Sequence, residues 1–338
     1  MDYVENGVER KEQLRRWIEA WLKRAPLSLE PASADASFRR YFRVDCGERT
    51  LIAMDAPPAH EDCRPFVKVA RLMAEAGLNV PQVIAEDLEN GFLLLSDLGN
   101  SGYLQALNAK SAPRLFADAT DALIRWQMAS RPGVLPLYDE ALLRRELDLF
   151  PEWYLQRHRG VTLSSAQRRT LDAVFDAVIQ SNLAQPQVYV HRDYMPRNLM
   201  VCTPNPGVLD FQDAVFGPIT YDVVSLFKDA FISWDEEQVL DWTVRYWEKA
   251  KRAGLPVDAD FGAFYRDFEW MGLQRHLKVL GIFARLNYRD GKSAYLEDTP
   301  RFIAYVRAVA ARYAALGPLL ALLDEVEGKA GASVGYTF

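Results

Sequence analysis

Residues 191–198 read His-Arg-Asp-Tyr-Met-Pro-Arg-Asn, and the tetrad Asp-Phe-Gln-Asp follows at 210–213. This spaced set of polar residues constrains the chain more than any other feature does. A single aspartate or asparagine in a loop usually forms a turn or a cap. The combination of Asp193, Asn198 and Asp210 at these spacings is far less common by chance, so it indicates a built site.

The flanking residues suggest the local structure that carries this set. The apolar run 187–190 predicts a strand that enters the segment. The runs 198–201 and 207–209 predict a hairpin that leaves it, because Thr-Pro-Asn-Pro at 203–206 is a turn signal. The three polar residues are therefore expected around one loop-and-hairpin unit.

The spacing H-R-D-x-x-x-x-N followed by D-F-x is typical of a kinase catalytic loop. Phosphoryl transfer needs an in-line hydroxyl and cations that spread over the phosphate oxygens. We therefore expect Asp193 to accept the proton of an acceptor hydroxyl. We expect Asn198 and Asp210 to bind Mg²⁺, which prefers oxygen ligands, and ATP to be the phosphoryl donor.

Composition excludes several classes of protein. A net charge of −6 argues against a nucleic-acid partner. The three cysteines form no Cys-x-x-Cys pair, which predicts a reducing compartment and no zinc site. Residues 1–16 lack the apolar run of a signal peptide, and charges and a proline interrupt the most apolar segment, 302–326. We expect a cytoplasmic protein without a membrane span. The oligomeric state stays open, with a monomer favoured.

The order of patterns predicts an α+β fold. An amphipathic helix is expected at 10–24 and a loop of small residues at 31–40. The β-rich part that follows is read as strands at 41–44 and 49–54, a helix at 65–76, and a hairpin of 83–88 with 92–96 around Asn-Gly. Helical patterns then dominate at 113–130, 138–158, 164–183, 222–233, 236–253, 261–288 and 300–325.

This order is that of a bilobal, protein-kinase-like fold. A small β-rich N-lobe, residues 1–98, would bind the nucleotide. A larger, mostly helical C-lobe, residues 99–338, would carry the catalytic loop and the acceptor. In that arrangement the backbone at 96–98 would meet adenine, and the loop 33–38 would cover the phosphates. The candidate nucleotide-binding residues are Ser33, Ser37, Arg39, Arg40, Ser96, Asp97 and Leu98.

One part of the kinase pattern is missing. Kinases carry a lysine in V-A-I-K on the strand that corresponds to 51–55, where it pairs with the α- and β-phosphates. Here Met54 or Asp55 stands in its place. Either Arg39, Arg40 or Lys68 substitutes for it, or nucleotide binding rests on the metal ions and the loop, and the sequence does not choose among these alternatives. A pseudokinase that binds nucleotide as a scaffold is an alternative, disfavoured because the base and both metal ligands are present.

The segment after the metal ligand argues against a protein kinase. It has no A-P-E motif and reads Gly-Pro-Ile-Thr-Tyr-Asp at 217–222. Together with the catalytic loop, this segment resembles the aminoglycoside phosphotransferase-like small-molecule kinases. The resemblance implies that Asp222 braces the loop, and we expect His191 and Arg192 to do the same. Read from its position alone, Asp222 would be a helix N-cap.

Six segments extend the resemblance over most of residues 30–290: 38–44, 54–70, 87–99, 150–155, 190–201 and 274–286. They are similar to the bacterial anomeric kinases that act on N-acetylmuramate and N-acetylglucosamine in cell-wall recycling. The resemblance implies ATP-dependent phosphorylation of the C1 hydroxyl of the free sugar, without choosing between the two sugars. It also includes the Asp-Ala-Pro-Pro stretch in place of the lysine. An aminoglycoside, choline, homoserine or fructosamine kinase is the alternative within the class.

Four residues are candidates for binding the amino sugar. Arg197 and Arg275 could pair with the lactyl carboxylate of N-acetylmuramate, because arginine binds carboxylates bidentately. Tyr194 could stack on the sugar ring, although most large aromatics belong to the core. Glu146 could bind sugar hydroxyls, although a solvated helix face is the commoner explanation for an acidic side chain.

Overall fold

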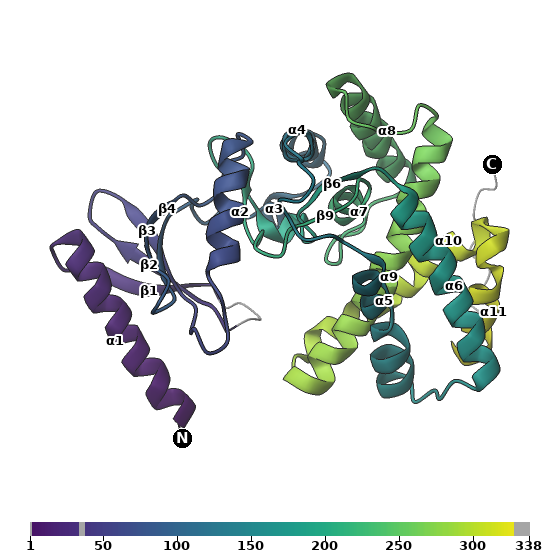
Figure 1. The fold of residues 1–338 in the computed structure, drawn as a ribbon, viewed down its shortest axis with the longest axis horizontal. Helices are drawn as coiled ribbons and strands as arrows, with labels where there is room; N and C mark the ends of the chain where they lie inside the picture. The colour runs from purple at the N-terminus through teal and green to yellow at the C-terminus, as the bar shows by residue number, and fades with distance from the viewer. Residues whose placement is uncertain (1, 34–37, 328–338) are drawn as a thin grey trace. The chain divides into compact units, whose positions relative to one another are not determined.

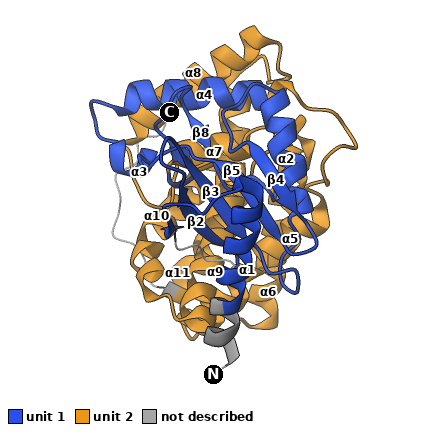
Figure 2. Cartoon of the chain, turned by 90° about the vertical axis from the view of Figure 1, so that its left-hand side faces the viewer, with its two compact units in different colours: residues 1–126, 197–214 blue, residues 127–196, 215–338 orange. Residues whose placement is uncertain are grey.

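The computed structural model describes residues 2–33 and 38–327 (Figure 1). The chain separates into two compact units (Figure 2). Unit 1 comprises residues 1–126 and 197–214, and unit 2 comprises residues 127–196 and 215–338. The division differs from the expected one at residue 98, because unit 1 continues further and also takes up the hairpin. Asp193 therefore belongs to unit 2, whereas Asn198 and Asp210 belong to unit 1.

Unit 1 is built on an antiparallel sheet in the order β1-β2-β3-β5-β4. Its first elements are α1 (Asp2–Leu22), β1 (Ser28–Ser33), β2 (Arg40–Asp45), β3 (Thr50–Asp55), α2 (Arg64–Glu75), β4 (Val83–Asp87) and β5 (Phe92–Ser96). The expectation of a loop from residue 31 is wrong for 31–33, which belong to β1; Pro31 and Ser33 pair with β2, with an irregularity between them. An edge strand tolerates Pro31, and nothing in its small residues predicts a strand, so its partner β2 decides its conformation.

The helix α1 covers one face of the sheet, and α2 lies on its other side (Figure 1). Alternate residues of a strand point to opposite faces. One set of alternating residues joins Leu14 and Ile18 of α1 in a buried cluster: Leu29, Phe42, Val44, Leu51, Ala53, Phe92 and Leu94. Arg40 and Asp55 are opposite each other in the register and share this face. The amphipathic pattern of α1 is therefore satisfied by packing on the sheet.

The remaining elements of unit 1 are α3 (Tyr103–Ala106), most of α4 (Ala112–Met128) and the predicted hairpin, β7 (Leu199–Met200) with β8 (Gly207–Val208). The hairpin is held by backbone hydrogen bonds from Val201 N to Ser101 O at 2.7 Å and from Val208 N to Asn79 O at 2.8 Å. Gly207 allows a close approach, because a Cβ there would lie 2.9 Å from a methyl carbon of Leu98. These contacts explain why residues 197–214 belong to unit 1.

Unit 2 combines a two-stranded sheet with helices. Its strands are β6 (Gln187–Val190) and β9 (Val215–Pro218), which pair antiparallel. Its main helical elements are α5 (Glu140–Leu147), the π-helical η1 (Phe150–His158), α6 (Ser165–Ala184), α7 (Tyr221–Phe227), α8 (Glu236–Ala253), α9 (Phe261–Asp290), α10 (Thr299–Arg312) and α11 (Gly317–Glu327). The long helix α9 packs against η1, α6, α7 and α10, and it forms the centre of this unit.

Three of the expected helices are shorter or interrupted. The helix expected at 138–158 is divided between α5 and η1, close to Pro151. The helix expected at 222–233 ends at Phe227, and the one expected at 300–325 is interrupted between α10 and α11, where Gly317 and Pro318 follow. Hydrophobic periodicity continues through such breaks because both halves pack on the same core. Among the described residues, no helix has the length and apolar character needed to cross a membrane.

Candidate active site

The predicted catalytic loop begins at His191, directly after β6, and α7 holds its backbone through hydrogen bonds. Asp222, in the first turn of α7, accepts hydrogen bonds from the backbone N–H of His191 at 2.6 Å and of Arg192 at 3.0 Å. Its side chain is fully buried, and burial raises the pKa of this carboxyl to about 7, against the lowering effect of the two N–H donors. The N-cap of α7 is Thr220, so the N-cap reading of Asp222 is wrong. Its contacts agree with a bracing role.

Asp193 itself is half-buried, and its backbone is fixed by neighbouring loop residues. Its N–H donates to Nδ1 of His191 at 3.2 Å, and the His191 ring meets the Tyr194 ring edge-on at 5.6 Å. The preceding residue, Arg192, has φ of +76°, a left-handed conformation that costs energy for any residue other than glycine. The surrounding contacts therefore hold a strained turn that sets the direction of Asp193.

The side chain of Arg192 is held by a buried polar network around Glu146. Oε1 of Glu146 accepts from Nη2 of Arg192 at 2.6 Å and contacts Nζ of Lys278 at 2.9 Å. Oε2 accepts from the Tyr138 hydroxyl and from Nε2 of Gln274 at 3.1 Å. Burial opposes ionisation here, but Lys278 and Arg192 outweigh it and lower the pKa of Glu146 to about 2.

This network bears on three of the expected sugar ligands, all in unit 2. Glu146 is buried and both of its oxygens are engaged by protein donors, so it acts as a support for the loop in this structure. Tyr194 is fully buried, so its ring has no exposed face on which a sugar could stack. Arg275 is also buried, and its Nη1 has no hydrogen-bond partner. Arg197, in unit 1, is exposed on the short 3₁₀ turn η2 (Pro196–Asn198).

The hairpin of unit 1 brings the two expected metal ligands together. Nδ2 of Asn198 lies 3.4 Å from Oδ2 of Asp210, and Leu209 N donates to Asn198 O at 2.9 Å. Asp210 has φ of +62°, so it is a second left-handed residue among the predicted site residues. Phe211 is fully buried and its ring lies 4.8 Å from that of Phe66 on α2, which anchors the segment in unit 1.

The donor set at this pair fits Mg²⁺. Magnesium is usually bound through one or two carboxylates and completes its shell with water and substrate phosphates. Nε2 of Gln212 donates to Asp210 at 2.9 Å, while its Oε1 is buried without a hydrogen-bond partner. The site thus offers a carboxylate and amide oxygens. The part of the chain that the structure describes contains no group of three His, Cys, Asp or Glu side chains that could hold a metal ion.

Gln212 was not among the residues singled out from the sequence. It stands where kinases carry the glycine of D-F-G, and that departure was a visible signal. The supports Lys278 and Tyr138 were also missed. No local pattern marks them, because a lysine on a helix is ordinarily read as solvated.

The candidate nucleotide residues fall into two groups. Ser37 lies outside the described residues, and for Ser33 only the backbone, at the end of β1, is described. Nη2 of Arg39 lies 3.9 Å from Oδ1 of Asp210, so the structure places Arg39 beside one of the two expected metal ligands. Arg40 instead binds the buried carboxylate of Asp55.

The expected adenine segment at 96–98 is tied to its surroundings by side chains. Oγ of Ser96 accepts from Gln82 N at 2.8 Å. Asp97 accepts from Nε of Arg43 at 2.7 Å and from Gly99 N at 2.9 Å. Burial raises the pKa of Asp97, but the hydrogen bonds from Arg43 and Gly99 outweigh it, so the pKa is lowered from its ordinary value. These side-chain contacts fix the segment that follows β5, and recognition of adenine by its backbone stays a prediction.

Comparisons with known proteins agree with this geometry. The model of the phosphotransferase enzyme family (APH) matches residues 28–256. The chain is 55% identical over 329 residues to the N-acetylmuramate/N-acetylglucosamine kinase of Pseudomonas aeruginosa, covering 94% of this chain and 97% of the relative. It is 48% identical over 336 residues to the protein of the same name from Neisseria meningitidis serogroup B, covering 98% of this chain and 100% of the relative.

A solved structure shares the fold at low identity. ADP-bound aminoglycoside phosphotransferase APH(2'')-Ib aligns with a TM-score of 0.56 at 12% identity, over 87% of this chain and 97% of that chain. The expected α+β fold of the protein-kinase-like phosphotransferases is thereby confirmed. The resemblance inferred from the loop and hairpin motifs is confirmed as well, and the chain belongs to the phosphotransferase enzyme family.

Proposed function

We propose that the protein is an ATP-dependent kinase that phosphorylates the C1 hydroxyl of N-acetylmuramate and N-acetylglucosamine, as a step of peptidoglycan recycling in the cytoplasm. The observation that carries the proposal is the 55% identity, over 94% of the chain, to a protein named as a kinase of these two sugars. The aspartate base and the oxygen ligands expected of a kinase are all present in this chain. The ADP in the related structure supports an adenine nucleotide as donor.

In the proposed reaction, Asp193 accepts the proton of the C1 hydroxyl as its oxygen bonds to the γ-phosphorus of ATP. The bond between that phosphorus and the β–γ bridging oxygen breaks, so the products are a sugar 1-phosphate and ADP. An anomeric hydroxyl is more acidic than an ordinary alcohol, so a single carboxylate suffices as base. Asp222 holds the loop by its backbone and thereby orients Asp193.

Asn198 and Asp210 would hold Mg²⁺, with Gln212 as a further oxygen donor. The ion would neutralise negative charge on the phosphate oxygens of the donor. Glu146 positions Arg192 and, through it, the residue that follows in the chain, Asp193. We therefore assign Glu146 to positioning. Arg197 and Arg275 remain proposed contacts for the acceptor.

The first experiment is an ADP-release assay with the full chain, Mg·ATP and a panel of acceptors. The panel contains both amino sugars, the 1-O-methyl glycoside of N-acetylglucosamine, choline and an aminoglycoside. We expect turnover with the free sugars and none with the methyl glycoside, whose C1 oxygen is blocked. ³¹P NMR should then show a glycosyl phosphate. Turnover with the methyl glycoside would refute the C1 assignment, and turnover with choline or the aminoglycoside alone would refute the substrate class.

Two variants test the assigned roles. Asp193→Asn should lower kcat by about 10²-fold or more, because general-base catalysis contributes at least that much, while Mg·ATP binding stays close to that of the wild type. Asp210→Ala should remove the Mg²⁺-dependent part of nucleotide binding. A near-normal kcat in the first variant, or unchanged Mg·ATP affinity in the second, contradicts the respective role. Binding of Mg·ATP without turnover of any acceptor would instead favour the scaffold alternative.

A further inference from the structure

The strand β3 lacks the lysine that binds the donor phosphates in kinases. Its last two residues are Met54, which is fully buried and apolar, and Asp55, whose charge has the opposite sign. A kinase of this kind still needs a cation at the α- and β-phosphates. The sequence offers Arg39, Arg40 and Lys68, and the internal geometry of unit 1 distinguishes them.

Arg40 is committed to a structural pair. It lies opposite Asp55 in the β2–β3 register, on the sheet face that packs against α1. Nε of Arg40 donates to one oxygen of Asp55 at 3.0 Å. Arg10 of α1 donates to the other oxygen from Nε at 3.0 Å and from Nη2 at 2.5 Å. Asp55 is fully buried. If Arg40 bound a phosphate instead, this buried carboxylate would keep only Arg10 of the two arginines that pair with it.

Arg39 lies just before β2, and its side chain takes a different direction from that of Arg40. The Arg39 guanidinium lies beside an expected metal ligand, because its Nη2 is 3.9 Å from Oδ1 of Asp210. The Arg39 side chain is 12% exposed, against 37% for Asp210. A largely buried guanidinium beside a metal ligand suits phosphate, because its planar fork can bind two phosphate oxygens at once.

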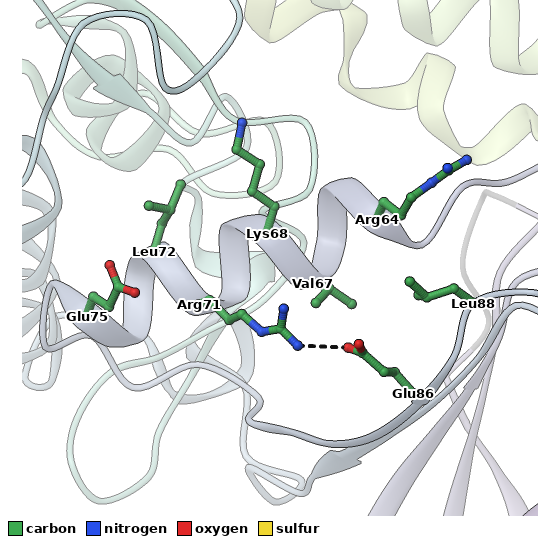
Figure 3. Close-up of a pocket in the computed structure, with 8 residues that line it drawn as sticks. All are labelled: Arg64, Val67, Lys68, Arg71, Leu72, Glu75, Glu86 and Leu88. Atoms are coloured by element: carbon green, nitrogen blue, oxygen red, sulfur yellow. Dashed lines mark hydrogen bonds and ion pairs between the residues drawn. The ribbon is translucent and has the colours of Figure 1, made fainter.

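Lys68 has a different setting. It lies on the exposed face of α2 and borders a surface pocket of about 400 Å³, and its ammonium points away from Glu86 and Leu88 (Figure 3). Glu86 and Leu88 line the opposite wall, and Arg71 crosses to Glu86 at 2.9 Å. An exposed ammonium is strongly hydrated and is carried on a flexible stem, so it gives less to a phosphate than a preorganised guanidinium does.

We propose that Arg39 takes the place of the missing lysine and binds the α- and β-phosphate oxygens of the nucleotide. This inference rests on the proposed kinase function. Asp55, one of the two residues at the place of the lysine, forms a structural set with Arg10 and Arg40. In this proposal the cation that binds the phosphates is the residue before β2, whereas kinases carry it on the strand that corresponds to β3.

The test measures nucleotide binding without acceptor, by calorimetry, on Arg39→Met, Arg39→Lys and Lys68→Met. The ligands are Mg·ADP, ADP with EDTA, and adenosine. We expect Arg39→Met to weaken both ADP forms by about 10- to 100-fold, the range for one charge-assisted contact, and to leave adenosine unchanged. Arg39→Lys should recover part of the loss, and Lys68→Met should change little. Arg49→Met removes an exposed charge next to the start of β3 and is the matched control.

Three outcomes overturn the inference. In the first, Arg39→Met binds both ADP forms as tightly as the wild type does. In the second, Lys68→Met, and not Arg39→Met, weakens the binding of ADP. The loss can also appear only with Mg²⁺, which would assign Arg39 to positioning Asp210 and not to the phosphates. A wild-type protein that binds Mg·ADP but phosphorylates no amino sugar refutes the proposed function while leaving this comparison valid.

Discussion

The buried carboxylate of Glu146 gives the sharpest test of how unit 2 supports the catalytic loop. We consider Glu146→Gln, which keeps the shape of the side chain but removes its charge. The new amide group faces Arg192, Lys278 and Gln274, all of which donate. The buried ammonium of Lys278 and the half-buried guanidinium of Arg192 would then share a neutral partner, so the folded state should lose stability.

The magnitude follows from the pKa. In the folded protein the pKa of Glu146 falls from 4.5 to about 2, which is worth about 3 kcal/mol at about 1.4 kcal/mol per pKa unit. Because the folded pKa is the lower one, this stability is fully present above pH 4.5 and is lost as the pH falls toward 2. The loss in the variant should be about 3 kcal/mol at pH 7 and about 1 kcal/mol smaller at pH 4.

The assay is urea unfolding followed by far-UV circular dichroism and tryptophan fluorescence at both pH values. Glu140→Gln, on the exposed first turn of the same helix, is the matched control and should unfold like the wild type. Steady-state kinetics with the sugar should show a lower kcat with little change in KM. A variant as stable as the wild type, but with a raised KM for the sugar, would refute the supporting role. It would restore Glu146 as a direct substrate ligand.

Two further predictions concern the stability of the folded chain. Replacing a helical glycine by alanine ordinarily stabilises a helix by about 1 kcal/mol. In α9 we expect this gain for Gly272→Ala, whose Cβ would find its nearest neighbours at 3.6 Å, but a loss of about 1–3 kcal/mol for Gly281→Ala, whose Cβ would lie 2.4 Å from the backbone of Leu149. The measurement is thermal unfolding of the two variants, and equal midpoints would contradict the close approach of α9 to the start of η1. Arg10→Met should destabilise the chain by about 1–3 kcal/mol, because Asp55 loses two charged hydrogen bonds, without weakening Mg·ADP binding. Weaker nucleotide binding at unchanged stability would contradict the structural role of this pair.

Much of the local structure could be predicted from the sequence. The strand 187–190, the hairpin after it and the hairpin around Asn-Gly are present where turn chemistry predicted them. Such signals depend on residues close together in the chain, so they survive without knowledge of the fold. The edge strand β1 could not be predicted, and the helix break near Gly317 was missed although Gly317-Pro318 is a local breaker signal. An edge strand forms because a neighbour offers its backbone, and a helix break can be hidden by continuous hydrophobic periodicity.

The sequence by itself pointed to phosphoryl transfer, because Asp193, Asn198 and Asp210 have the residue types and the spacing expected of a base and two metal ligands. Only the tertiary structure showed which other charged side chains lie beside these residues. Glu146 looked like a solvated side chain but is buried by helices distant in the sequence. Arg39 and Arg40 are adjacent in the sequence, yet Arg39 lies beside Asp210 and Arg40 is paired with Asp55. Burial and facing depend on what packs against an element, and no local pattern of residues contains that information.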